Sequence, residues 1–245
     1  MICTAYFNHL PDPQRKSSWP ADDYHTIRSW HHSIDSLGLK AVLFHNAFSP
    51  DFVDRYTTPN IRFIRVDPGP YLPNDCRWGV YARYLADIDD DYILLTDCCD
   101  VTVLQDPFEF ITAEDKLYIG DEATKRRGLK TIGGTRWMLN CFDTTGPGDI
   151  RRSLPDLRNK PVLNCGIVGG SRKTIRFYVE TAARLIQECN PVPEAVAKQK
   201  VQIIDMAVAN YIGYVMLRGE VIHGHPLHNR FKLKDTRTDV YIRHK

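Results

Sequence analysis

Short apolar stretches alternate with amphipathic stretches through the first hundred residues. Segments of strand length, apolar at 41–44 and 92–95 and mixed at 2–7 and 62–66, predict four strands. Between them, residues 22–37 carry apolar side chains at spacings of three and four, which predicts an amphipathic helix, and residues 78–85 predict a second helix. This alternation of strands and helices predicts an α/β sandwich with a mostly parallel sheet.

The second half of the chain is less regular. Its pattern favours strands at residues 116–120, 137–142 and 162–170, and helices at residues 174–189 and 201–211. Residues 143–161 contain several prolines and glycines and are interpreted as a long surface excursion. Because no repeat, low-complexity tract or linker divides the sequence, we expect one domain over residues 1–245.

Composition narrows the class of protein without identifying it. The 245 residues are 43% hydrophobic and 25% charged, which is typical of a globular protein with a sizeable core. A net charge of +2 gives no global electrostatic argument for binding nucleic acid or a membrane. The N-terminus lacks the pattern of a secretion signal, and no apolar run approaches the ~18 residues of a membrane span. Seven cysteines without a CxxC pair favour reduced thiols, and we expect a cytoplasmic protein.

Two acids directly follow the apolar strand at residues 92–95. Asp97 and Asp100 lie where that strand ends, and ligands of parallel α/β sheets bind beyond the carboxyl ends of the strands. Carboxylate oxygens suit Mg²⁺ or Mn²⁺, and such ions commonly bridge one or two acids to a substrate phosphate. A surface turn in which the same acids cap backbone amides explains the pattern equally well.

Asp205 is the second unusual acid. On the helix expected at residues 201–211, it falls on the same face as the apolar residues Val201, Ile204 and Val208. A carboxylate directed at a core is costly unless it is paired. The position therefore indicates either a structural acid satisfied by amides or an arginine, or an active-site acid.

Three histidines lie close together near the end of the chain. His223, His225 and His228 follow a short apolar strand, and neutral imidazole is a common metal ligand. Arg230 and Lys232 follow them and could neutralise a diphosphate. The alternative is a histidine-rich surface tail.

Arginine and glycine residues mark two further candidate positions. Arg77 lies at the start of the helix before the acidic strand, from which it could reach a phosphate or a sugar hydroxyl. Gly166, Gly169 and Gly170 would let the backbone approach a ligand closely, or they are turn glycines. Neither a GxxxxGK[ST] loop nor a GxGxxG fingerprint is present, so the sequence lacks the common phosphate-binding motifs.

Taken in order, these segments resemble glycosyltransferases of the GT-A fold, with a layout most similar to the glycogenin-like and related retaining families. The matching landmarks are the strand at residues 2–7, Arg77, the DxD-like region at Asp97 and Asp100, Asn164 with Gly166, Asp205, and His223 with Lys232. Each motif is short, and their joint order over about residues 2–234 carries the resemblance.

The resemblance implies a Rossmann-like, three-layer α/β sandwich with the GT-A fold. Residues 1–106 would form the nucleotide-binding half, and residues 107–245 the acceptor-binding half with a C-terminal metal and phosphate segment. It also implies an enzyme of the hexosyl- or pentosyltransferase type, which moves a sugar from a nucleotide sugar, with UDP the favoured nucleotide, to an acceptor. A retaining mechanism is favoured. The acceptor is left open between a glycan, a protein, a lipid and a modified nucleobase.

The resemblance further implies roles for individual residues. Asp97 and Asp100 would bind Mn²⁺ or Mg²⁺, with His223 as the third ligand and His225 as its competitor. The residues implied to bind the donor's nucleoside or phosphates, or to line its site, are Thr4, Tyr6, Arg77, Asp97, Gly166 and Lys232. Asp205 and Asn164 are the implied catalytic residues on the side of the transferred sugar and the acceptor.

Two departures from the family pattern matter. Asp97 and Asp100 are spaced i and i+3 instead of i and i+2, so both reach one ion only if the chain turns after Asp97. Met206 stands where the family often has glutamine. The alternatives kept open are a non-catalytic protein of the same fold that binds a sugar or a nucleotide, and a sugar nucleotidyltransferase, whose glycine-rich GxGxR start is missing here.

Overall fold

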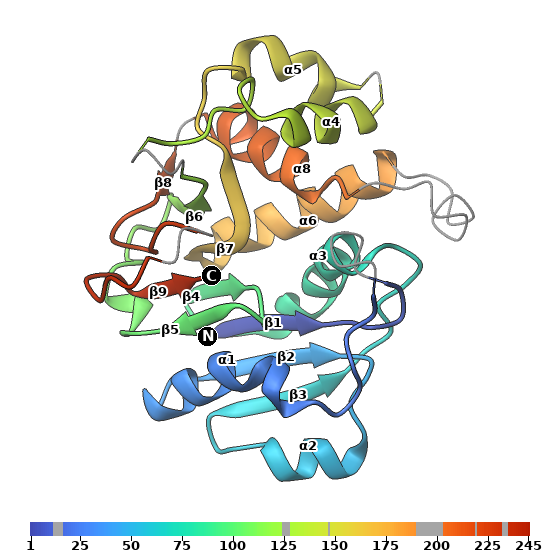
Figure 1. Cartoon of the computed structure of the whole chain (residues 1–245), viewed down its shortest axis with the longest axis vertical. Coiled ribbons are helices and arrows are strands. Elements are labelled where there is room, and N and C mark those ends of the chain that lie inside the picture. Colours follow the sequence, from blue (N-terminus) through green and yellow to red (C-terminus); the bar gives the residue numbers. More distant parts are fainter. Residues whose placement is uncertain (12–16, 124–127, 147, 190–202, 219, 232–234) are drawn as a thin grey trace.

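A seven-stranded sheet forms the centre of the molecule (Figure 1). The computed structural model describes residues 1–11, 17–123, 128–146, 148–189, 203–218, 220–231 and 235–245. The strand order is β3-β2-β1-β4-β7-β6-β8. These strands are β1 (Ile2–Tyr6), β2 (Ala41–His45), β3 (Ile61–Arg65), β4 (Tyr92–Thr96), β6 (Leu117–Asp121), β7 (Leu163–Ser171) and β8 (Val221–His223). Because β7 alone runs antiparallel to its neighbours, the prediction of a mostly parallel sheet is confirmed.

Helices cover both faces of the sheet (Figure 1). They are α1 (Tyr24–Ser36), α2 (Pro50–Tyr56), α3 (Pro73–Tyr84), α4 (Arg136–Thr144), α5 (Asp149–Leu157), α6 (Arg172–Cys189) and α8 (Asp205–Tyr211). Shorter helical turns are η1 (Leu85–Asp87), η2 (Pro107–Glu109) and η3 (Ile212–Met216). Helix α1 lies on one face, and α3, α6 and α8 lie on the other.

Successive side chains of the strands alternate between the two faces of the sheet, and each face has its own hydrophobic cluster. In β1, Ile2 packs with the residues of α1, whereas Cys3 packs with those of α3 and α6. In β2, Leu43 likewise belongs to the cluster on the α1 face, and Val42 belongs to the cluster on the face of α3 and α6. Successive side chains of a strand point to opposite faces, so a strand buried on both sides needs an unbroken apolar run. This arrangement confirms the predicted three-layer α/β sandwich.

The element predictions fail mainly between β6 and β7. Residues 137–142, predicted as a strand, lie in helix α4, where Met138 and Phe142 are completely buried at a helical spacing of four. Residues 143–161, predicted as a surface excursion, contain α5 despite Pro155 within it. Helix α2 was not predicted. The helix expected at 201–211 begins at Asp205 in the structure, and residues 201 and 202 lie outside the described residues.

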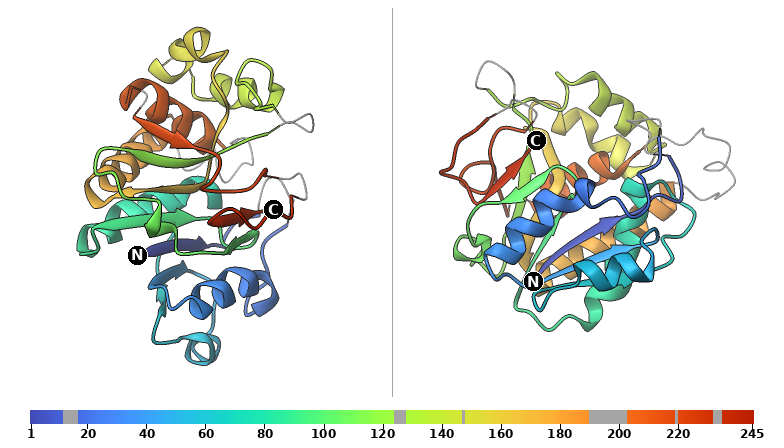
Figure 2. Two further views of the ribbon diagram at one scale, coloured as in Figure 1. Left: turned by 90° about the vertical axis from the view of Figure 1, so that its left-hand side faces the viewer. Right: turned by 60° about the horizontal axis from the view of Figure 1, so that its bottom comes forward.

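A second, two-stranded sheet brings the C-terminus to the centre of the molecule. Strand β5 (Val101–Val103) pairs antiparallel with β9 (Ile242–His244), and Val101 lies opposite His244. Figure 2 shows the C-terminal strand beside the segment that leaves β4. This pairing places a histidine near the end of the chain next to the two acids that follow β4.

His45 at the end of β2 is expected to make the stability depend on pH. It is 2% exposed, and its Nδ1 accepts a hydrogen bond from the backbone N–H of Phe48 at 3.2 Å. Burial, with a contribution from Arg65, lowers the pKa of His45 from 6.5 to about 4. As the pH falls, the His45 side chain of the unfolded chain takes up a proton before that of the folded chain. The contribution of neutral His45 to the free energy of unfolding is therefore complete above pH 6.5. It is lost as the pH falls towards 4, by about 3 kcal/mol at most.

Urea unfolding at several pH values measures this loss. In His45→Asn, the amide oxygen can still accept the hydrogen bond but does not titrate, so the decline in unfolding free energy between pH 6.5 and pH 4 should be smaller by that amount. An unchanged decline in the variant would contradict the assignment to His45.

Among the residues that the structure describes, none of the helices combines the length and the apolar character needed to span a bilayer.

Candidate functional site

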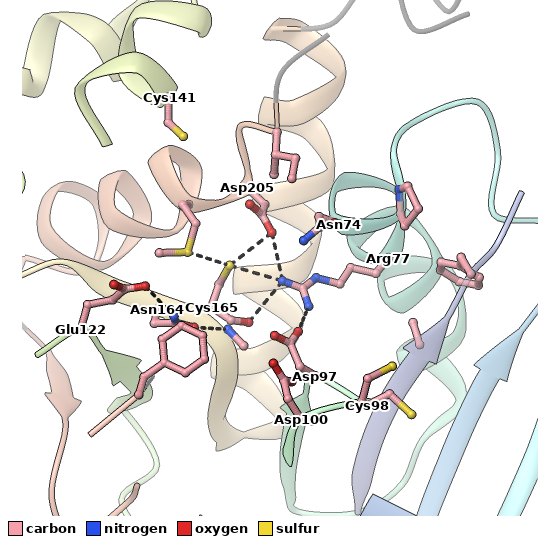
Figure 3. A pocket seen from close by; sticks show the side chains of 18 of the residues that line it. Asn74, Arg77, Asp97, Cys98, Asp100, Glu122, Cys141, Asn164, Cys165 and Asp205 are labelled. Atoms are coloured by element: carbon pink, nitrogen blue, oxygen red, sulfur yellow. Dashed lines mark hydrogen bonds and ion pairs between the residues drawn. The ribbon is translucent and has the colours of Figure 1, made fainter. Parts of the chain in front are cut away.

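A pocket of about 610 Å³ opens at the edge of the sheet where β1, β4 and β6 end (Figure 3). Its floor is formed by the turn after β4, the start of β7, and helices α3 and α8. Tyr6 and Trp19 line it on the side of β1, and Trp137 lines it on the side of α4. The position agrees with the rule that ligands of α/β sheets bind beyond the carboxyl ends of the strands.

The turn between β4 and β5 carries Asp97 and Asp100, and it brings both acids to one histidine. The Nε2 atom of His244 lies 3.5 Å from Oδ2 of Asp97 and 3.6 Å from Oδ1 of Asp100. One ligand atom from each of these three residues lies within 4.8 Å of the others. The i, i+3 spacing is therefore compatible with one shared ligand, because the chain leaves the strand after Thr96 and turns before β5 begins.

His244 has the features of an unsatisfied ligand. It is 1% exposed, and neither of its ring nitrogens makes a hydrogen bond within the described part of the chain. Its backbone N–H is fixed by Oδ1 of Asn229 at 2.6 Å. A buried imidazole whose ring nitrogens make no hydrogen bond is costly, and two carboxylates with one imidazole form a donor set that suits Mn²⁺ or Mg²⁺. The three residues therefore fit a divalent cation.

Gly166 is required by the close packing of this cluster. A Cβ atom at Gly166 would lie 2.5 Å from Cε1 of His244 and 2.6 Å from Oδ2 of Asp97. Its carbonyl oxygen accepts the backbone N–H of Asp97 at 2.7 Å, and its N–H donates to Oδ1 of Asn164 at 2.8 Å. The glycine noted in the sequence thus lets β7 approach the acids.

The structure places His223 and His225 outside this cluster, which corrects their predicted place beside the acids. Nδ1 of His223 lies 2.8 Å from Asp121, and the exposed His225 lies 3.1 Å from Asp239. Burial alone would raise the pKa of Asp121, but His223 and His228 together lower it to about 2. Strand β8 pairs with β6, and this pairing directs His223 to the acid at the end of β6. His244 holds the position that the sequence assigned to the other histidines.

Arg77 connects the acidic turn to helix α8 (Figure 3). One end of its buried guanidinium forms a very short ion pair with Asp97, and its Nη2 donates to Oδ2 of Asp205 at 3.0 Å. Burial alone would raise the pKa of Asp97, but Arg77 and His244 hold it well below its usual range. Asp97 is thus kept ionised, as a metal ligand must be.

Asp205 is held at the first turn of α8 by two residues of α3. Its side chain binds Arg77, and its backbone N–H donates to Oδ1 of the buried Asp75 at 3.0 Å. Oδ1 of Asp205 has no described partner. Burial raises the pKa of Asp205 despite Arg77, and burial together with Asp205 raises the pKa of Asp75. The structure shows the pairing with an arginine that the first alternative for Asp205 expected, and it also places Asp205 in the lining of the pocket.

Asn164 lies at the start of β7 and joins a second polar chain. Its Nδ2 donates to Glu122 at 3.1 Å, and Glu122 pairs with Lys130. Asn164, Glu122 and Lys130 all line the pocket. Glu122, which is 4% exposed and directly follows β6, was not among the predicted site residues.

The remaining predicted residues differ in their relation to the pocket. Tyr6 lines it and donates its hydroxyl to the carbonyl of Pro20 at 2.7 Å. Thr4 is completely buried and donates to the carbonyl of Thr96 at 2.8 Å, and it is not part of the pocket lining. Lys232 lies outside the described residues.

Comparison with known proteins gives matches among solved structures. No protein-family model matches the sequence, and no curated protein does so either. The structure of the galactosyltransferase LgtC in complex with donor and acceptor sugar analogues superposes with a TM-score of 0.55 at 14% identity, covering 99% of this chain and 86% of that chain. An active-site mutant of LgtC gives 0.54 with the same identity and coverage. The likeness therefore extends over the whole architecture.

Proposed function

Because the chain has the GT-A glycosyltransferase fold, we propose that it is a metal-dependent glycosyltransferase that uses a nucleotide sugar, with UDP the favoured nucleotide. The observation that carries this proposal is the buried, unsatisfied His244 beside Asp97 and Asp100 in the pocket. The likeness to a galactosyltransferase whose structure contains donor and acceptor sugar analogues supports the same reaction class.

In the proposed mechanism, one group of residues in the pocket binds the metal and another contacts the transferred sugar. Asp97, Asp100 and His244 would hold Mn²⁺ or Mg²⁺, which supplies positive charge to a diphosphate leaving group. Arg77 keeps Asp97 ionised and orients its carboxylate, while the same guanidinium fixes Asp205 above it. Asp205 and Asn164 also line the pocket, and they would contact the transferred sugar.

Several finer features belong to this proposal. We propose residues 1–106 as the nucleotide-binding half and 107–245 as the acceptor-binding half, since the aromatic residues Tyr6 and Trp19 lie at the β1 end of the pocket. We also propose that a hexosyl or pentosyl group is transferred with retention of configuration, on the basis of the resemblance in motif order to the retaining families. A cytoplasmic location is supported by the seven free cysteines.

A donor screen tests the proposal. UDP-, GDP- and other nucleotide sugars are incubated with Mn²⁺ or Mg²⁺, and nucleotide release is measured with and without the metal. We expect turnover of one donor class that depends on the metal. Asp100→Asn should lower this turnover at least about 100-fold, because it removes a charged ligand, and should leave the circular dichroism spectrum and the unfolding midpoint nearly unchanged.

Other outcomes separate the alternatives. Binding of a nucleotide sugar without turnover would identify the non-catalytic alternative. Pyrophosphate release from a nucleoside triphosphate and a sugar phosphate would identify a nucleotidyltransferase. Normal turnover by Asp100→Asn would contradict the assigned site.

A further inference from the structure

Helix α4 presents one side to the pocket and the other to the core. Trp137, Asn140 and Cys141, at spacings of three and four, line the pocket. Met138 and Phe142 are completely buried. The helix therefore forms a rigid wall whose pocket side is an indole followed by an amide one turn later.

Trp137 is the most exposed of the four tryptophans, at 38%. Trp30 and Trp78 are fully buried, and Trp19 lies against Tyr6 with their ring centroids 6.2 Å apart. A large aromatic side chain left open inside a pocket is a binding surface, because covering its face removes apolar area from water. Trp137 therefore indicates a ligand with an apolar face.

Helix α4, which carries Trp137, lies at the end of the pocket away from β1: Figure 3 shows Cys141 of this helix on the side of Glu122. Along the sheet edge the order is β1 with Tyr6, β4 with the acidic turn, β7 with Asn164, and β6 followed by Glu122. Helix α4 follows β6 in the chain. A nucleoside at the β1 end and a diphosphate at the acidic turn leave the α4 end free for the acceptor.

The polar groups at this end favour hydroxyl groups as partners. Asn140 and Asn164 offer amides, which both donate and accept, and Glu122 offers a carboxylate. The two described cations that line the pocket, Arg77 and Lys130, are each paired with an acid. Binding of a polynucleotide needs several cations for its phosphates, and among the described residues the pocket lining offers no unpaired one.

We propose, resting on the function proposed above, that α4 forms the acceptor subsite and that the acceptor is a carbohydrate whose pyranose ring stacks on Trp137. The apolar C–H face of the ring covers the indole, and its hydroxyls bond to Asn140 and to the Glu122–Asn164 pair. The indole selects for a ring, and the amides select for its hydroxyl pattern.

Saturation-transfer NMR with methyl glycosides of glucose, galactose and mannose tests this without turnover. We expect transfer to the ring protons of at least one glycoside, its loss in Trp137→Ala and its partial recovery in Trp137→Phe. Phe177→Ala is the matched control, since Phe177 on α6 is 39% exposed and does not line this pocket. No transfer from any glycoside, or equal transfer in wild type and Trp137→Ala, would overturn the subsite.

A kinetic measurement separates this inference from the proposed function. With the donor found by the screen, the ratio of sugar transfer to donor hydrolysis should fall about tenfold in Trp137→Ala and stay unchanged in Phe177→Ala. If glycoside binding depends on Trp137 but no donor is turned over, the proposed transferase activity is refuted and the carbohydrate subsite is supported. Donor turnover with a peptide or an oligonucleotide as the better acceptor would refute the carbohydrate subsite and leave the transferase standing.

Discussion

Replacing His244 with alanine is expected to lower metal-dependent turnover about 100-fold, the upper end of the range seen when groups that support a metal are removed. The substitution leaves Asp97 and Asp100 without their imidazole partner. Calorimetric titration with Mn²⁺ should show a matching loss of affinity.

His223→Ala is the matched control for that variant. His223 also pairs with an aspartate, at 2.8 Å, but that aspartate is Asp121 at the end of β6. We expect it to retain Mn²⁺ affinity close to that of the wild type. If His223→Ala loses the metal and His244→Ala keeps it, the third ligand is the one that the sequence first indicated, and the structural assignment is wrong.

The acidic half of the proposed metal site was predictable because its signal is local. Asp97 and Asp100 follow a buried strand, and a strand ending in two acids can be recognised within ten residues of sequence. His244 lies about 145 positions further on, and only the pairing of β9 with β5 brings it to the acids. A local pattern was present, because Val240 and Ile242 are buried and alternate with half-buried residues before His244. The three clustered histidines at 223–228 were a stronger pattern in the wrong place.

The same contrast holds for the fold. The strands β2 and β4 are short, almost wholly apolar runs that are buried on both sides, which leaves few alternatives to a central strand. The segment at 137–142 is short and apolar, and such a segment is compatible with either a strand or a helix. Packing against α8 and the burial of Met138 and Phe142 select the helix. The interior of the sheet was therefore predictable from sequence, and the helical wall beside it was not.

Arg77 illustrates how α3 organises two distant segments. Its guanidinium lies between Asp97 in the turn after β4 and Asp205 at the start of α8, and its Cζ atom lies 4.7 Å from the ring centroid of Trp78. Two positions earlier, Asp75 accepts the backbone N–H groups of Ile204 and Asp205. The first turns of α3 thus fix both Asp97 of the proposed metal site and Asp205, the acid proposed to lie beside the transferred sugar.

Removing the Arg77 charge is expected to have the largest effect on stability. Arg77→Met should lower the free energy of unfolding by about 3–5 kcal/mol, because it leaves Asp205, 3% exposed, without its buried counter-charge and frees Asp97 as well. Arg77→Lys should recover only part of the loss, since one ammonium does not span two carboxylates as the planar guanidinium does.

The double variant Arg77→Met with Asp205→Asn distinguishes charge from packing. If the uncompensated acid causes the loss, neutralising Asp205 should restore about half of it, and urea unfolding near neutral pH measures the difference. A double variant no more stable than Arg77→Met would mean that the side chain acts through its contacts with Trp78 and Cys165 instead. Neither variant should transfer sugar efficiently, because Asp97 has lost the partner that orients it toward Asp100 and His244.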